Sequence, residues 1–160
     1  MQSLIAEFDH ESTNTRKMLE RVPDEHLQWK PHEKSYTLGK LATHIATMPG
    51  WFTMTVGQSE LDLSVPMEQP KPQTCEELLS IFDAETSAAR TALSTATEDV
   101  LAHAWTLRHG DHVIFTMPKS AVLRDMCFNH IVHHRGQLSV YLRLLDVPVP
   151  GLYGPSADER

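Results

Sequence analysis

The sequence contains few cysteines, no long apolar run and no recognisable targeting segment. Cys75 and Cys127 are its only cysteines in 160 residues, too few for a disulfide framework, so we expect two free thiols. No apolar stretch approaches the ~20 residues that span a bilayer, which argues against a membrane protein. The stretch MQSLIAEFDHESTNTRKMLERV lacks the basic start, apolar run and cleavage site of a secretory signal. We therefore expect a cytoplasmic location.

Positive charge is also scarce. The chain has 14 Lys and Arg residues against 21 Asp and Glu residues, which gives a formal net charge of -7. Nucleic-acid binding depends on basic side chains that neutralise phosphates, and the basic residues here form no cluster beyond isolated pairs. The composition therefore predicts no nucleic-acid partner.

The sequence does contain strong helical periodicity. Its length and its 41% apolar content suit a single globular domain over residues 1–160. Apolar residues recur at three- and four-residue steps in four segments, as in amphipathic helices. These segments are residues 2–21, a second from Ser35 or Thr37 to about Val56, a third from Thr74 to about Ala96, and a fourth from Pro118 to about Leu145.

The connections between these helices carry their own signals. Pro49 predicts a kink or a break in the second helix between Ile45 and Pro49. The proline-rich stretch 57–73 predicts a long surface loop. Alternating apolar residues around a His-Gly-Asp turn predict a short two-stranded ribbon near residues 105–115. The predicted fold class is therefore all-α, a four-helix bundle with a small β-ribbon between its third and fourth helices.

The stretch HIVHHRGQ places three histidines on the fourth helix. With 100° of rotation per residue, His130 and His134 share the centre of the apolar stripe, whereas His133 lies at its margin and Arg135 lies off it. Residues four apart lie one turn apart on the same face, so His130 and His134 are close enough to share one divalent ion.

A third inward histidine is available on the second helix, where His44 shares an apolar face with Trp51. A single histidine on such a face is usually a hydrogen-bonded core residue. Three on facing helices, two of them at ligand spacing, favour a metal site made of His44, His130 and His134. Three histidines with a fourth position open to water are typical of a catalytic site.

Other residues are weaker candidates for the same site. Cys127, one turn before His130, is a possible fourth ligand that would close the site, although a buried cysteine more often packs as a small apolar residue. Ser12 and Thr15 are candidates for a cavity wall, although buried hydroxyls commonly bond their own backbone. Trp51 and Tyr141 lie on the stripes that carry the histidines and could line a pocket or simply fill the core.

The remaining cysteine, arginines and histidines have no partner or spacing that indicates a site. Cys75 lies in the first turn of the third helix, where the helix dipole would lower its thiol pKa, but no partner is evident. Arg135 and Arg143 flank the histidine stripe and face away from it. Most of the other histidines are expected to be solvated; these are His10, His26, His32, His103, His109 and His112.

Three stretches together resemble a known family: TRKMLERVPDEHLQWKPHEKS, LGKLATHIATMPGW and FNHIVHHRGQLSVYLRLLDVPVPGLYGPSADE. The resemblance is to the DinB family of small four-helix-bundle proteins, and it covers nearly the whole chain. It implies one divalent ion, nickel or zinc, held by His44, His130 and His134. It also implies a homodimer.

The resemblance leaves the reaction open. It implies a metal-dependent enzyme that acts on a small molecule, either a hydrolase or a transferase that uses a low-molecular-weight thiol. In both, the ion would act as a Lewis acid that lowers a pKa, of water in the first case and of the thiol in the second. The alternative is a non-catalytic stress-response module that binds a small ligand or a protein, with a structural metal or none.

Overall fold

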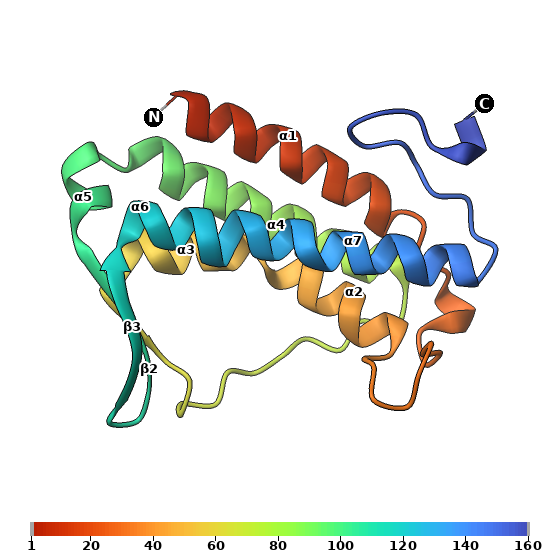
Figure 1. The fold of residues 1–160 in the computed structure, drawn as a ribbon, viewed down its shortest axis with the longest axis horizontal. Coiled ribbons are helices and arrows are strands. Elements are labelled where there is room, and N and C mark those ends of the chain that lie inside the picture. The colour runs from red at the N-terminus through yellow and green to blue at the C-terminus, as the bar shows by residue number, and fades with distance from the viewer. Residues whose placement is uncertain (1, 160) are drawn as a thin grey trace.

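The computed structural model describes residues 2–159 and is predominantly helical, with a small three-stranded sheet at one end (Figure 1). Its helices are α1 (Gln2–Leu19), α2 (Leu38–Thr47), α3 (Pro49–Gly57), α4 (Cys75–Thr95), α5 (Glu98–Ala102), α6 (Lys119–Val122) and α7 (Asn129–Leu144). The 3-10 turns are η1 (Asp24–His26) and η3 (Ala157–Glu159), and a π-helical turn, η2 (Leu123–Phe128), joins α6 to α7. The strands are β1 (Glu60–Asp62), β2 (Ala104–His109) and β3 (His112–Pro118).

The long helical segments pack side by side around a shared core. Helix α4 contacts α1, α2 and α3, while α7 contacts α1 and α2 from the other side (Figure 1). Leu41 and Ile45 of α2 are buried in the same core cluster as Leu138 and Leu142 of α7. Burying each such side chain stabilises the fold by about 1.5–3 kcal/mol. This packing fixes α2 against α7, the two helices that carry the candidate ligands.

The break predicted near Pro49 is confirmed. Helix α2 ends at Thr47 and α3 begins at Pro49, where a proline is tolerated because the first helical residue needs no amide donor. At the other end of α2 the cap is Thr37 and not Ser35, since the Thr37 hydroxyl accepts a hydrogen bond from the Lys40 amide at 3.2 Å.

The sheet is larger than the predicted two-stranded ribbon. Strand β2 pairs antiparallel with β3, as predicted, and Gly110 in the turn between them has a φ of 58°, a conformation that favours glycine. Strand β1 pairs parallel with β2 on the other side. The prediction of an irregular loop over residues 57–73 is therefore wrong at residues 60–62.

Strand β1 forms because its residues find partners far along the chain. Leu61 is buried against Trp105 and Leu107 of β2. The Asp62 carboxylate accepts hydrogen bonds from the Gly110 amide at 2.9 Å and from the Arg108 guanidinium at 2.5 Å. After β1, residues 63–74 run back along the helices to the start of α4; we call this segment the strap (Figure 1).

The predicted fourth helix is interrupted by the π-helical turn η2. A π-helix has more residues per turn than an α-helix, so a constant 100° step misplaces the residues before His130. Cys127, considered as a ligand one turn before His130, is instead buried with Leu123, Phe8 and Phe52 in a cluster of the core. None of the helices within residues 2–159 combines the length and the apolarity that a bilayer crossing requires.

Candidate metal centre

The structure brings together His44 from α2 and His130 and His134 from α7. One ring nitrogen from each of the three lies within 4.8 Å of the others. The ring centroids are 4.6 Å apart for His44 and His134, 5.3 Å for His44 and His130, and 4.6 Å for His130 and His134. All three side chains are half-buried. The three residues selected from sequence spacing therefore form one cluster.

A further residue, Gln137, orients one of the rings. The Oε1 atom of Gln137 lies 2.7 Å from Nδ1 of His134, which places a hydrogen on Nδ1 and leaves the lone pair on Nε2. This Nε2 points into the cluster, 2.8 Å from Nε2 of His130. Such outer hydrogen bonds commonly fix the tautomer of metal-binding histidines. Gln137 lies three residues after His134 on α7 and was not among the residues selected from the sequence.

The surroundings keep the three imidazoles neutral. Burial, together with positive charge on the neighbouring His134 and His130, lowers the pKa of His44 to about 4. Burial also lowers the pKa of His130 and of His134. Neutral imidazole is the form that binds a metal ion, so the cluster is in its binding form at neutral pH.

The donor set fits a divalent cation. The Nδ1 atom of His130 is buried and has no hydrogen bond of normal geometry within residues 2–159, although the Met126 carbonyl one turn earlier partly offsets the lowering of its pKa. Three neutral imidazoles from two helices, with one ring aligned by an outer amide, are the ligands of many three-histidine zinc sites. Such a set leaves a coordination position for another molecule.

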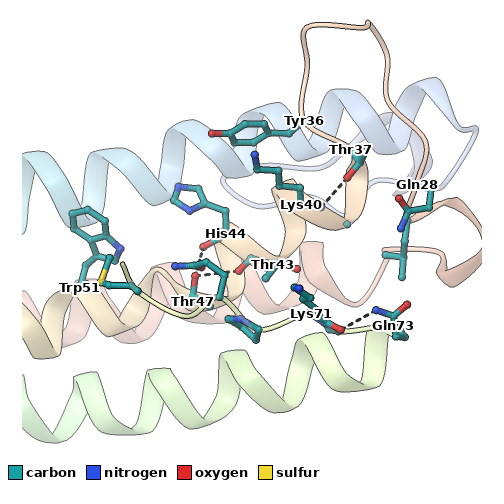
Figure 2. A pocket seen from close by; sticks show the side chains of 16 residues that line it. Gln28, Tyr36, Thr37, Lys40, Thr43, His44, Thr47, Trp51, Lys71 and Gln73 are labelled. Atoms are coloured by element: carbon teal, nitrogen blue, oxygen red, sulfur yellow. Dashed lines mark hydrogen bonds between the residues drawn. The ribbon is translucent and has the colours of Figure 1, made fainter. Parts of the chain in front are cut away.

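Two cavities reach the cluster from different sides. The larger, of about 450 Å³, is lined by His44 and Trp51 together with Lys40, Thr43 and Lys71 (Figure 2). The smaller, of about 350 Å³, is lined by residues that include His134, Gln137 and Tyr141. Trp51 and Tyr141 therefore each line a cavity, which was one of the two roles considered for them. Neither Lys40 nor Lys71 was selected from the sequence.

Cys127 does not join the histidines, so the fourth-ligand hypothesis is wrong. Its side chain is fully buried, and its Sγ lies 3.8 Å from the Thr55 hydroxyl of α3. Burial raises the pKa of this thiol to about 12. The cause of the error is the η2 turn, which directs Cys127 toward α3.

Ser12 and Thr15 do not line either cavity beside the histidines, and Thr15 instead bonds its own backbone, the commoner of the two outcomes considered for it. The Thr15 hydroxyl donates to the Glu11 carbonyl at 2.7 Å and accepts from Arg135 at 3.0 Å. Arg135 faces away from the histidines, as predicted, but it is only 1% exposed and its guanidinium also pairs with the Glu11 carboxylate at 2.5 Å. The Tyr153 hydroxyl from the C-terminal segment completes this network.

The other sequence candidates lie away from the cluster. The pKa of Cys75 is raised and not lowered, because burial and the nearby Asp24 and Glu20 carboxylates outweigh the charge of Arg16. Arg143 is exposed and pairs with Asp158. His133 is exposed, as are five of the six other histidines, with His26 half-buried; the exposed five are His10, His32, His103, His109 and His112.

Comparisons with known proteins agree with the fold and with the sequence resemblance. The curated protein YrdA of Bacillus subtilis, described as uncharacterised, is 27% identical over 160 residues, which is 99% of this chain and 91% of YrdA. The crystal structure of a DinB-like protein from Bacillus cereus matches with a TM-score of 0.75 and 27% identity, covering 96% of this chain and 97% of that one. For the DinB-like protein YjoA of Bacillus subtilis, the TM-score is 0.72 at 18% identity with 99% of both chains covered, a likeness of fold alone.

The description of the matching family is "DinB family", and the match extends over residues 1–160. It covers the helices that carry His44, His130 and His134 as well as the sheet and the C-terminal segment. This chain belongs to the DinB family.

Proposed function

We propose that the protein binds one divalent ion, zinc or nickel, through His44, His130 and His134, and that it is a metal-dependent enzyme. The observation that carries the proposal is the approach of three neutral imidazole nitrogens to within 4.8 Å at the edge of a cavity. When bound, the ion supplies Lewis-acid chemistry that lowers the pKa of a water molecule or of a low-molecular-weight thiol.

The residues around the cluster have separate tasks in this proposal. Gln137 holds the His134 ring in one tautomer, and the indole of Trp51, 6.1 Å from the His130 ring between centroids, shields one side from water. The adjoining cavity has the size of a small-molecule site. A small organic substrate therefore fits the site better than a nucleic acid, which the net charge of -7 also disfavours.

The proposal also covers the domain organisation, the oligomeric state and the location of the protein. We propose that residues 1–160 act as one domain, a DinB-type four-helix bundle in which α2 and α3 count as one broken helix. The exposed apolar residues Val132, Val140 and Leu144 on α7 support a homodimer in which a second copy covers this face. Two free cysteines are consistent with a reducing, cytoplasmic location.

Metal content tests the proposal directly. Plasma mass spectrometry on untagged protein, after incubation with zinc or nickel and desalting, should find close to one ion per chain in the wild type and little in His134→Ala. The matched control is His133→Ala, which removes an exposed imidazole from the preceding position and should leave metal content unchanged. Absence of an ion from the wild type, or equal loss in both variants, would contradict the site.

The two reactions are then separated on metal-loaded protein. A transferase should consume an electrophilic acceptor faster when a small thiol is added, whereas a hydrolase should cleave an activated ester without one. The metal-free protein and His134→Ala are the controls in both assays. Full metal binding with no activity in either assay would favour the non-catalytic binding module.

A further inference from the structure

We propose that the larger cavity binds an anionic group of the substrate, a carboxylate or a phosphate, between Lys40 and Lys71. The inference deepens the proposed function by naming a substrate class. It rests on that function only for the reaction at the histidines, because the two lysines belong to the cavity whether or not an ion is bound.

The charge of the cavity is opposite to that of the protein. Lys40 lies on α2 and Lys71 on the strap, so the two ammonium groups belong to different walls (Figure 2). Of the residues that the structure describes, those lining the cavity include no aspartate or glutamate. In a chain with seven more acidic than basic residues, a lining with two cations and no carboxylate is a local excess of positive charge.

Neither lysine is neutralised by a neighbour. Within residues 2–159, neither Lys40 nor Lys71 forms an ion pair, whereas several arginines of this protein do. The Lys40 ammonium lies 4.2 Å from the centre of the Tyr36 ring, a cation–π contact that orients it without cancelling its charge. Lys40 precedes His44 by one turn of α2, and both side chains line this cavity. An anion in the cavity would therefore lie next to the metal cluster.

The strap holds Lys71 in place. Pro70 and Pro72 flank it; a proline fixes its own φ, and it also restricts the preceding residue to extended conformations. The Lys71 carbonyl accepts a hydrogen bond from the Gln73 side chain at 2.9 Å. Glu68 is on the same segment, but it is not among the residues that line the cavity. The strap thus presents a cation to the cavity on a restricted backbone.

The rest of the lining defines the shape of the ligand. Thr43 and Thr47 provide hydroxyl groups along α2, and Trp51 and Met67 provide apolar surface. Figure 2 shows Trp51 at one end of the cavity, with His44 between it and Lys40. A matching ligand has an anionic group at the lysines and a less polar part that extends past His44 toward Trp51.

Binding of three probes with the same tail tests the inference. The probes are phenylbutyrate, phenylbutyl phosphate and phenylbutanol, titrated into metal-free ¹⁵N-labelled protein at constant ionic strength, with the amide signals of Thr43, Thr47 and Trp51 followed by NMR. Both acids should bind at these residues more tightly than the alcohol, and the tighter of the two acids indicates whether the natural group is a carboxylate or a phosphate.

Substitution of the lysines provides the decisive comparison. Lys40→Gln and Lys71→Gln should each weaken binding of the preferred acid by about tenfold, because each removes a charge-assisted hydrogen bond, and should leave binding of the alcohol unchanged. Lys17→Gln is the matched control, since it changes the net charge equally at an exposed position of α1 outside the cavity, and should change acid binding less than about twofold.

Equal binding of acids and alcohol in the wild type, or equal weakening by Lys17→Gln and Lys40→Gln, would overturn the anion site. Metal content measured on the same samples keeps this result separate from the proposed function. Acid binding that depends on Lys40 and Lys71 in a protein that takes up no ion would support the anion site and refute the metal enzyme. Metal uptake by a protein that binds the acids and the alcohol equally would refute the anion site and support the metal site.

Discussion

At the scale of single residues, the environment of each thiol predicts its reactivity. Burial raises the pKa of Cys127 to about 12 and also raises the pKa of Cys75. The thiolate is the reactive form, so native protein treated with iodoacetamide at pH 8 should leave Cys127 unmodified and modify Cys75 slowly. Mass spectrometry of peptides checks this, with urea-unfolded protein as the control in which both thiols react. Rapid labelling of Cys127 in the native protein would contradict its burial.

The buried ion pair of Arg135 and Glu11 should matter far more to stability than an exposed one. Arg135→Ala leaves the Glu11 carboxylate, in a side chain only 12% exposed, without its cation, and should lower the free energy of unfolding by about 3 kcal/mol. Arg124→Ala, which breaks the exposed pair with Glu7, should cost less than about 1 kcal/mol. Urea denaturation followed by circular dichroism measures the free energy of unfolding of both variants. Similar losses in Arg135→Ala and Arg124→Ala would contradict the greater importance of the buried pair.

The sequence was most informative about individual residues where helix geometry alone decides their direction. His130 and His134 follow η2 on a regular helix, so constant rotation placed them correctly, and His44 followed from the apolar face of α2. Lys71 could not be found in this way, because its position depends on how the strap crosses α2, which has no periodic signal.

At the scale of elements, the attachment of β1 depends on one carboxylate. The hydrogen bond from the Gly110 amide, with those from Ser64 and the charge of Arg108, lowers the pKa of Asp62 from 3.8 to about 2. The folded state thus favours the ionised form. The resulting stabilisation is fully present above pH 4 and is lost as the pH falls toward 2.

Asp62→Asn tests this attachment. The variant should be less stable than the wild type at pH 5 to 7, and the difference should shrink to a small fraction by pH 2, where about half of the wild-type carboxyl is protonated in the folded state. Amide hydrogen exchange should show faster exchange at Leu63, whose amide donates to the Arg108 carbonyl at 2.8 Å. A difference that does not vary with pH would mean that charge on Asp62 is unimportant.

The elements that could not be predicted from the sequence are β1, which depends on partners far along the chain, and the η2 turn. Strand β1 is three residues long, and it is held by Arg108 and Gly110, which lie 46 and 48 residues after Asp62. The η2 turn has no sequence signature of its own, since its residues suit an α-helix equally well. The first three amphipathic segments, the start of α4 after Thr74 and the break at Pro49 depend on local sequence, and these were predicted correctly.

At the scale of the whole molecule, the proposed metal should stabilise the fold, because its three candidate ligands are brought together only in the folded state. Zinc at a free concentration of about 100 times its Kd should add about 2.7 kcal/mol and raise the melting temperature by roughly 5 to 10 °C. Differential scanning calorimetry would measure this shift. His134→Ala should show no shift and His133→Ala a normal one; an equal shift in His134→Ala would mean that zinc binds elsewhere.

The C-terminal segment, residues 145–159, connects α7 with α1. Asp158 pairs with Arg143 at the end of α7, and Tyr153 reaches Arg135 and Glu11 between α7 and α1. This segment therefore links α7 to α1 through contacts that do not involve the histidines. From the sequence alone, the Pro- and Gly-rich tail from Val147 onward could pack over the end of the bundle, pack over a dimer partner, or be exposed.

The adjacency of His134 and Arg135 has a mechanical consequence. The two side chains leave α7 in different directions, one toward the ligand cluster and the other into the buried ion pair with α1. A rotation of α7 about its axis that moved the imidazole would also pull the guanidinium from Glu11 and Tyr153. The contacts of Arg135 with Glu11 and Tyr153 therefore restrain rotation of α7 and, with it, the position of the His134 ring.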